Sequence, residues 1–550
     1  MTGATVSLSA PRDMDQVRRE LLKLVGKAAV ATIGCAMVPR SAGAATAPIS
    51  AASTVFDVRS FGAVGDGKAI DSTAINRAIE AASATGGAVF FPAGLYACYS
   101  LRLKSAVSLY LDQGSVIMAA DTPREGTTSG YDPAESNAPW EAFQDFGHNH
   151  WHNSLIWGEN IHDVAIFGPG LIWGRGLARG HDDPELPIAE APGVGNKAIA
   201  LKNCHNIILR DLPMLACGHF AILATGVDNL TIDNLKIDTN RDGINIDCCR
   251  NVHISNCSVN SPWDDAICPK SSFALGYARP TENVTIANCY VTGGYQVGSL
   301  IDGSFKRFPE TFEDHGWQRT GRIKLGTESN GGFRNIAIAN CVFESCRGLA
   351  LETVDGGIME DITVTGVTMR DIRNAPLFLR LGSRLRGPAG TPVGALKRVL
   401  ISNVTCHAPL NDMPSIISGV PGHAVEDIQI SNCYFLQKGG GTAEMAALQP
   451  SEQPSDYPEP ARLGPLPAQH FYIRHARNLE ISNVEVRGVT VDARPSFWLG
   501  DVNTADLMGV KLTGGIGPAV SLNNVSDFRA LANRGLKDVS IEGPISHMQL

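Results

Sequence analysis

The sequence predicts a right-handed parallel β-helix, an all-β fold in which one short unit stacks on itself. Three observations predict it. A unit made of a strand, a turn containing Asn or Gly and a second strand recurs along the chain, and its closest pair is offset by 22 residues (Val252 against Leu230). The units are rich in β-branched residues, and no long helical pattern separates them. They are also too short for a propeller blade, which needs about 40 residues.

Two sets of segments make up the predicted coils. The repeated unit occurs at Asn206–Leu212, Asn229–Ile237, Asn251–Val259, Asn283–Val291, Asn335–Phe343, Asp361–Met369, Arg398–Cys406, Asp427–Phe435 and Asn478–Val486. Between these units we expect the strands His219–Thr225, Asp242–Asp247, Asp264–Lys270, Tyr295–Ile301, Arg322–Thr327, Gly348–Thr353 and Ala375–Leu381. Neighbouring parallel strands lie roughly 4.8 Å apart, so the second set should stack into one sheet.

The N-terminal part of the chain predicts an export signal followed by one domain. Residues 1–45 contain Arg18-Arg19, a short, mildly apolar run (Leu24 to Val38) and the small-x-small pattern Ala42-Gly43-Ala44. This is typical of a twin-arginine signal and too short to span a membrane, although an amphipathic cytosolic helix is an alternative. We therefore expect a periplasmic or secreted protein with no membrane association after signal removal.

Residues 46–550 are expected to form a single β-helix domain, with the N-terminal cap and first coils at about 55–120 and the catalytic coils at about 195–440. Asp71 is placed to cap a helix. An apolar stripe at helical period follows it: Ala74, Ile75, Ala78, Ile79 and Ala82. Such a helix would cover the open end of the first coil, as repeat proteins require. We expect a monomer.

Composition narrows the class of partner. The net charge is −9, and no basic run occurs beyond the N-terminus, which argues against nucleic acid. The spacing of the 13 cysteines is neither that of a zinc site nor that of a compact disulfide scaffold. Four of them follow Asn at the same repeat position and predict a stack of small apolar side chains: Cys257, Cys289, Cys341 and Cys433. An oxidising compartment would allow a few disulfides.

Acidic residues recur at equivalent points of two successive coils. Asp242 opens one apolar run, and the pair Asp264-Asp265 opens the next, 22 and 23 residues later. Like charges this close raise one another's pKa, so that one carboxyl can serve as an acid while another stays ionised as a base. Turn residues between strands are the structural alternative. Read down the whole sheet, the polar positions are Asp242, Asp264, Asp265, Lys270, Tyr295, Gln296, Arg322, Lys324 and Glu352.

This constellation predicts cleavage of an anionic polysaccharide. An acid and a base on neighbouring coils suit inverting hydrolysis, for which carboxyl groups about 6.5–9.5 Å apart are needed. Arg322 and Lys324, two residues apart on one face of a strand, could bind a uronate carboxylate. Long loops could wall the sheet into a cleft: Trp140 to Trp157, Asp302 to Gly321 and Gly439 to Pro467. Trp151, Trp157, Trp263 and Trp317 lie in or beside them and either face sugar rings or simply pack.

The chain resembles the pectin-degrading glycoside hydrolases of family 28, the polygalacturonases, from FGAVGDGKAIDSTAINRAI to at least Phe435. Their motifs correspond here to Asn240-Arg241-Asp242, Asp264-Asp265 and Arg322-Ile323-Lys324. The resemblance implies a pectin-lyase-like solenoid, with Asp264 as general acid and Asp242 and Asp265 acting on the water. It also implies that Arg322 and Lys324 bind a substrate carboxylate. Tyr295, Gln296, Lys270 and Glu352 are further candidates for substrate binding, and no cofactor or metal is expected.

Two departures from the family pattern leave the substrate open. Arg241 stands where the family has Thr, and Gly294-Tyr295-Gln296 stands in place of its Gly-His-Gly motif. The substrate could therefore be galacturonan, rhamnogalacturonan or a substituted galacturonan, attacked within the chain or from its end. The same residues would also suit a calcium-dependent lyase, with the aspartates as metal ligands, or a non-catalytic carbohydrate-binding β-helix.

Overall fold

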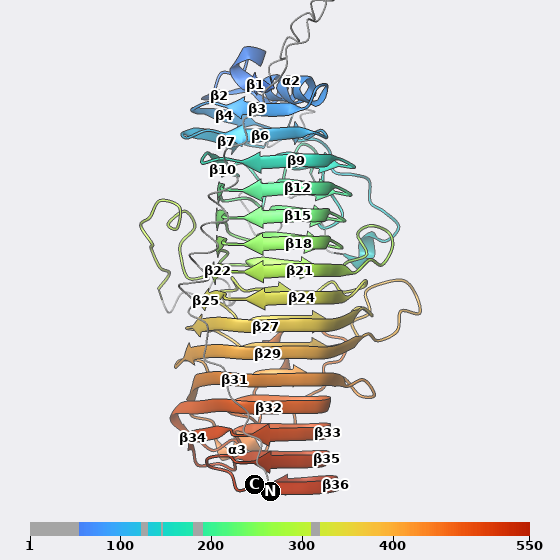
Figure 1. Ribbon diagram of the computed structural model, residues 1–550, viewed down its shortest axis with the longest axis vertical. Coiled ribbons are helices and arrows are strands. Elements are labelled where there is room, and N and C mark those ends of the chain that lie inside the picture. Colours follow the sequence, from blue (N-terminus) through green and yellow to red (C-terminus); the bar gives the residue numbers. More distant parts are fainter. Residues whose placement is uncertain (1–53, 123–129, 145–146, 180–190, 310–318) are drawn as a thin grey trace, which may run out of the picture. The chain divides into compact units, whose positions relative to one another are not determined.

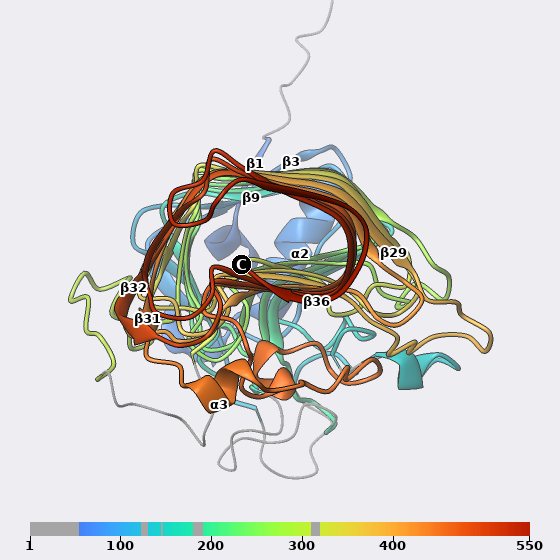
Figure 2. The ribbon, with the colours of Figure 1, turned by 90° about the horizontal axis from the view of Figure 1, so that it is seen from below.

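The computed structural model describes residues 54–122, 130–144, 147–179, 191–309 and 319–550, and Ser53–Leu550 forms one compact unit. This unit is a right-handed parallel β-helix, as predicted (Figure 1). Seen end-on, its coils superimpose around a continuous apolar core (Figure 2). The predicted export signal, residues 1–45, lies outside the described residues and stays a prediction.

Each coil contributes strands to three faces. The first face, called the front sheet here, consists of β5 (Leu101–Arg102), β8 (Ile156–Glu159), β11 (Lys197–Lys202), β14 (Phe220–Thr225), β17 (Asp242–Asp247), β20 (Ile267–Lys270), β23 (Lys324–Leu325), β26 (Leu349–Thr353), β28 (Leu377–Leu381), β30 (Ser415–Ser418) and the first residues of β32 (Phe471–Asp492), β33 (Phe497–Met508) and β35 (Val520–Leu531). All of these pairings are parallel, so equivalent residues of successive coils stack in columns.

The other two faces continue each coil. The second face consists of β1 (Val55–Asp57), β3 (Gly87–Phe91), β6 (Val107–Leu111), β9 (His162–Phe167), β12 (His205–Arg210), β15 (Asp228–Asp233), β18 (Arg250–Ser255), β21 (Thr281–Ala287), β24 (Phe333–Ala339), β27 (Ile358–Arg370), β29 (Ala395–Ala408) and β31 (Val425–Gly439). The third consists of β2 (Asp66–Ile70), β4 (Gly94–Cys98), β7 (Ser115–Ala119), β10 (Leu171–Trp173), β13 (Pro213–Leu215), β16 (Lys236–Asp238), β19 (Ser258–Asn260), β22 (Tyr290–Thr292), β25 (Val342–Glu344), the ends of the longer strands and β34 (Lys511–Gly515).

The Asn turns of the repeat have a conformational cause. Asn229 and Asn251 both adopt left-handed backbone angles, with φ of 54° each, which Asn tolerates better than most residues. Their side chains also form a ladder, because the Asn251 amide donates to the Asn229 side-chain oxygen (3.2 Å). The same residue type therefore turns the chain and joins one coil to the next.

Both ends of the solenoid are covered. Helix α2 (Ser72–Ser83) buries its predicted apolar stripe over the first coil, which confirms the cap (Figure 1). Asp71 is the N-cap residue, as predicted, although its carboxylate accepts from the amides of Val64 and Gly65 and from no helix amide. At the other end, β36 (Val539–Gln549) pairs with β35 in the antiparallel sense and so covers the last parallel edge.

The core is apolar throughout. All twelve cysteines of the described part are buried and unpaired, and the predicted stack includes Cys257, Cys289 and Cys341. No disulfide therefore forms among these residues. Within the described ranges, no helix is both long enough and apolar enough to cross a membrane.

One predicted strand is wrong. Tyr295–Ile301 forms no strand of the front sheet but a loop with turns, and Ile323 pairs directly with Ile267. The chain leaves the coil at Gly293 and returns at Gly321, whose positive φ of 54° lets the two backbones touch. The Arg322–Lys324 segment therefore lies one coil from Asp264-Asp265, not two.

Two of the predicted long loops cover the outer face of the front sheet. Trp151 packs on β11 and β14 beside Phe220 and Leu223. Residues of the 439–467 loop, which includes α3 (Ala443–Ala446) and the 3₁₀ turn Pro460–Leu463, pack on β26, β28 and the coils that follow (Figure 2). The polar part of the sheet lies between these two covers. Trp317 and part of the Asp302–Gly321 loop lie outside the described residues.

Candidate active site

The three predicted aspartates come together at the start of two adjacent front-sheet strands. Asp242 is the first residue of β17, and Asp264-Asp265 directly precede β20. Asp242 and Asp265 are buried, with carboxylate oxygens within 4.8 Å of each other, whereas the Asp264 side chain is 25% exposed. Asp264 is therefore the carboxylate of the three that a ligand can reach directly.

Two cationic side chains contact Asp265, one of the two buried carboxylates. Arg322 Nε donates to Asp265 Oδ1 (2.9 Å), and Lys324 Nζ lies 2.7 Å from Asp265 Oδ2. Burial by itself would raise the pKa of Asp265, but the Lys324 and Arg322 charges hold it well below its usual value. Burial and the nearby Asp264 charge raise the pKa of Asp242 well above its usual value. The surroundings of the two carboxyl groups therefore shift their pKa values in opposite directions.

Asp264 is held from two sides. Arg241 donates from Nη2 to Asp264 Oδ2 (3.0 Å), and the Asp265 amide donates to Asp264 Oδ1 (2.9 Å). The backbone also fixes this turn, since the Gly321 amide donates to the Asp264 carbonyl oxygen (2.8 Å). Arg241, which stands where the family has Thr, thus places its guanidinium group against the exposed Asp264 carboxylate.

Lys270 and Glu352 are both buried on the front sheet, and each has polar contacts of its own. Lys270 Nζ donates to Glu328 Oε2 (2.8 Å), and although burial alone would raise the pKa of Glu328, the Lys270 charge holds it well below normal. Glu352 accepts from Thr327 Oγ1 (3.2 Å) and lies 3.8 Å from Arg322. Burial raises the pKa of Glu352 to about 7.

Sequence comparisons identify relatives of this chain. A family profile described as "Rhamnogalacturonase A/epimerase, pectate lyase-like" matches residues 55–264, and one described as "Right handed beta helix region" matches residues 220–384. A probable polygalacturonase of Vitis vinifera is 26% identical over 57% of this chain and 60% of its own length. An exopolygalacturonase of Arabidopsis thaliana is 23% identical over 70% of this chain and 81% of its own length. The chain is similar in sequence to polygalacturonases over more than half of its length.

A solved structure supports the fold. The exopolygalacturonase of Thermotoga maritima superposes with a TM-score of 0.51 at 17% identity, covering 90% of this chain and 95% of that one. The match to the Vitis vinifera relative spans only about 60% of that protein's length.

Tyr295 does not take the place of the polygalacturonase-family histidine beside the aspartates. Its hydroxyl donates to Glu344 Oε2 (3.2 Å) and accepts from Arg307 Nη2 (3.2 Å), both outside the front sheet. Gln296 is exposed in the loop that follows. The expectation that these two residues lie among the polar positions of the sheet is therefore wrong, because the Gly293–Gly321 excursion carries them away.

Two residues that sequence reasoning missed, Glu459 and Tyr457, cover Arg322 and Lys324. Glu459 Oε2 lies 3.4 Å from Arg322 Nη2 and 2.8 Å from Arg347 Nη1, and its Oε1 accepts from Asn374 Nδ2 (3.1 Å). Tyr457, from the same loop, accepts from Lys324 Nζ (3.3 Å). The only sequence signal was the length of the 439–467 loop, which predicts a wall but not which side chains point inward.

On the N-terminal side of the aspartates, the buried ammonium group of Lys197 donates only to side-chain amides among the described residues. Lys197 Nζ donates to Asn153 Oδ1 (3.1 Å) and to Asn196 Oδ1, and burial lowers the pKa of Lys197 to about 7. Within the described residues, no carboxylate lies within ion-pair distance of this ammonium group. Among the described residues, Arg322 and Lys324 on the β26 side of the site form salt bridges, whereas the Lys197 ammonium group on the β11 side forms none.

Possible metal ligands occur in three places in the described part of the chain, and each already holds a cation of the protein. Asp242, Asp265 and Cys268 form one group, where Lys324 lies on Asp265. Glu135, His152 and Glu159 form a second, with Lys202 Nζ 3.0 Å from Glu159. Glu452, His475 and Asp501 form a third, beside Arg474. None of these donor sets fits a divalent cation without displacing an ammonium or guanidinium group.

Proposed function

We propose that this protein hydrolyses galacturonate-containing pectic polysaccharide by a single inverting displacement. The observation that carries the proposal is the pair of buried carboxyl groups next to the exposed Asp264, one of which, Asp265, contacts both Arg322 and Lys324. Splitting the protonation of neighbouring carboxyls is how glycosidases keep an acid and a base in one site. The named activities of the relatives agree with this chemistry.

In the proposed reaction, Asp264 takes up a proton from solvent as substrate covers it and then donates that proton to the leaving glycosidic oxygen. The ionised Asp265 accepts a proton from the attacking water, and the protonated Asp242 orients that water by a hydrogen bond. The new C–O bond forms as the glycosidic C–O bond breaks, so that atoms and charges balance. Arg322 and Lys324 hold Asp265 ionised throughout, and their contact with a substrate carboxylate requires Glu459 and Tyr457 to give way.

A chain-end mode of attack is the second part of the proposal. The outer face of the front sheet is covered on both sides of the aspartates, by Trp151 on one side and by the loop carrying Tyr457 and Glu459 on the other. An internal segment of a polymer needs a groove that is open in both directions, whereas a chain end needs only a pocket. We therefore propose release of short products from one end of the polymer.

We also propose that residues 1–45 direct export and that the mature protein acts as a monomer in the periplasm or outside the cell. The twin-arginine pattern supports the first of these statements.

The decisive experiment measures reducing ends released from polygalacturonate and from rhamnogalacturonan in the presence of a chelator. Wild type should release saturated products from one of the two, and Asp264→Asn should lose at least about 10²-fold in rate. Asp506→Asn, on β33 far from the cluster, is the matched control and should keep full activity. Unsaturated, ultraviolet-absorbing products would support a lyase instead, and binding without any product would support a carbohydrate-binding solenoid.

The chain-end mode has its own readout. Chain-end attack releases many reducing ends before viscosity falls, and the products are short from the first minutes. A rapid fall in viscosity at low release would contradict it.

A further inference from the structure

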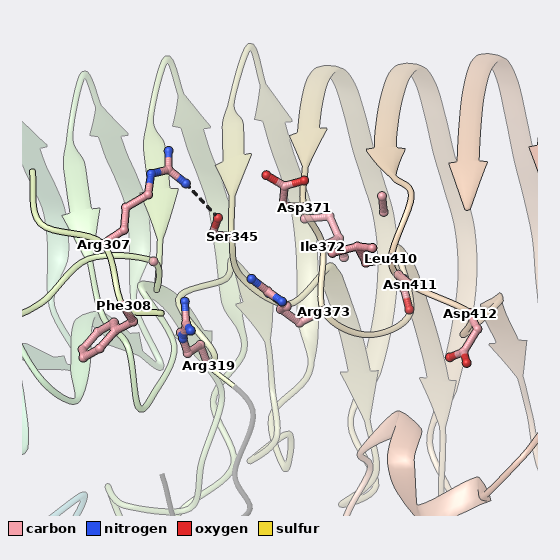
Figure 3. A pocket seen from close by; sticks show the side chains of 12 residues that line it. Arg307, Phe308, Arg319, Ser345, Asp371, Ile372, Arg373, Leu410, Asn411 and Asp412 are labelled. Carbon is pink, nitrogen blue, oxygen red and sulfur yellow. Dashed lines mark hydrogen bonds between the residues drawn. The ribbon is translucent and has the colours of Figure 1, made fainter. Parts of the chain in front are cut away.

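A polar cavity opens on the edge where the third face turns into the front sheet, on the C-terminal side of the aspartates. Its volume is about 260 Å³. Its lining includes three arginines (Arg307, Arg319 and Arg373), two aspartates (Asp371 and Asp412) and Ser345 (Figure 3). The arginines therefore outnumber the acids of the lining by one.

Backbone hydrogen bonds place this cavity relative to the aspartates. The Thr320 amide donates to the Pro262 carbonyl, the Arg347 amide to the Thr320 carbonyl, and the Arg373 amide to the Cys346 carbonyl. These are successive coils along one edge, beginning with the turn that carries Asp264. At ~4.8 Å per coil, Arg373 lies about three coils, or ~14 Å, from Asp264.

The arginines of the cavity differ in how their charges are balanced. Arg307 pairs with Glu344, and Arg319 donates to the Pro309 carbonyl and lies over the Phe308 ring, 5.2 Å from its centroid. The Nε of Arg373 is buried and has no hydrogen-bond partner among the described residues.

Arg319 and Arg373 also repel each other. Burial and the Arg373 charge both lower the pKa of Arg319. Figure 3 shows the Arg373 guanidinium pointing toward Arg319 and Ser345. Among the described residues Arg373 forms no salt bridge, so its charge would be stabilised by an anion that enters the cavity.

The acids of the cavity do not supply that anion. Asp371 lies 3.7 Å from Arg370, and Asp412 lies 3.9 Å from Lys438, both on the exposed rim. An incoming carboxylate would instead meet the Arg373 guanidinium group, with the Ser345 hydroxyl nearby as a second donor.

We propose that this cavity, called the Arg373 pocket, is a distal subsite that binds the carboxylate of a galacturonate residue about three coils from the bond being cleaved. The proposal rests on the proposed function and adds where the bound chain continues. The direct path along the front sheet is occupied by Glu459, which bonds Asn374, the neighbour of Arg373 in sequence. The edge of the coil is the remaining route past that loop.

The test compares Arg373→Gln with wild type on galacturonate oligomers of increasing length. The KM of the longest oligomers should rise about tenfold, while the dimer and the kcat of all oligomers stay unchanged. Methyl-esterified oligomers should show no difference between the two proteins. Arg529→Gln, which removes an exposed arginine from β35, is the matched control for net charge, and Arg373→Lys should recover part of the loss.

A binding measurement separates this proposal from the function itself. Calorimetric titration with hexagalacturonate compares Asp264→Asn with the double variant Asp264→Asn, Arg373→Gln. Weaker binding by the double variant would support the Arg373 pocket even if no polymer is cleaved. Equal binding by the single and the double variant, or no binding by either, would overturn the proposed role of the Arg373 pocket. If binding is equal and wild type still hydrolyses the polymer, the proposed hydrolase function is unaffected.

Discussion

Two arginines that lie two coils apart show opposite uses of the same side chain. Arg322 lies in the front sheet, almost fully buried, with Asp265, Glu352 and Glu459 within 3.8 Å. Arg373 lies at the coil edge in a cavity, and its buried Nε has no partner within the described ranges. The first guanidinium is neutralised by the protein's own carboxylates. The second has its charge available for a ligand.

This difference separates charged side chains that stabilise the fold from those that are available to bind substrate. Burial of an ion pair has a desolvation cost, but removal of one partner is strongly destabilising because it leaves an uncompensated buried charge. An arginine without a partner has no such bond to lose. Substitution of Arg322 should therefore affect stability and activity together, whereas substitution of Arg373 should affect binding alone.

The largest effect is expected from Arg322→Gln. Asp265 would keep only Lys324, so the unfolding free energy should fall by about 3 kcal/mol, and activity by roughly 10³-fold because the base loses its position. Urea unfolding and initial rates measure the two effects. For Arg373→Gln the unfolding free energy should change by no more than about 0.5 kcal/mol. Equal destabilisation by both variants would remove the distinction drawn here.

A pH effect of intermediate size is expected from Glu352. Its folded pKa of about 7 lies above the value of 4.5 for an unperturbed Glu, so the protonated form stabilises the fold. That contribution is complete below pH 4.5 and is lost as pH rises to 7, a fall of about 3 kcal/mol at 1.4 kcal/mol per pH unit. Unfolding free energies from pH 4.5 to 7.5 should therefore fall less steeply in Glu352→Gln than in wild type. Parallel curves would contradict the protonated state.

Much of the fold could be predicted because every coil shows the same pattern of strands and turns. Each Asn turn and each alternating strand supports the same register, and the apolar stripe after Asp71 predicted α2 correctly. The Tyr295–Ile301 error has a local cause. Its alternating pattern matches a strand, but contacts between Gly293 and Gly321, 28 residues apart, exclude it from the sheet.

The site was predictable only in part. The positions of Asp242, Asp264 and Asp265 follow from the period of the coils, and so does their proximity to Arg322 and Lys324. The side chains of long loops have no such period. Nothing in the sequence around Tyr457 and Glu459 indicates that they lie on those cations, more than 130 residues away along the chain.

The smallest effect is expected from Glu459→Gln, and it tests whether substrate ever visits Arg322. The amide keeps the shape of the side chain and can still accept from Asn374, but it no longer neutralises Arg322 and Arg347. If a uronate carboxylate competes for these cations, its KM should fall a few-fold, while the unfolding free energy drops by about 1 kcal/mol or less. Glu444→Gln, an exposed change on α3 of the same loop, controls for the loss of one negative charge. An unchanged KM for Glu459→Gln would mean that Arg322 serves Asp265 alone and that the Arg373 pocket carries the recognition of anionic sugar.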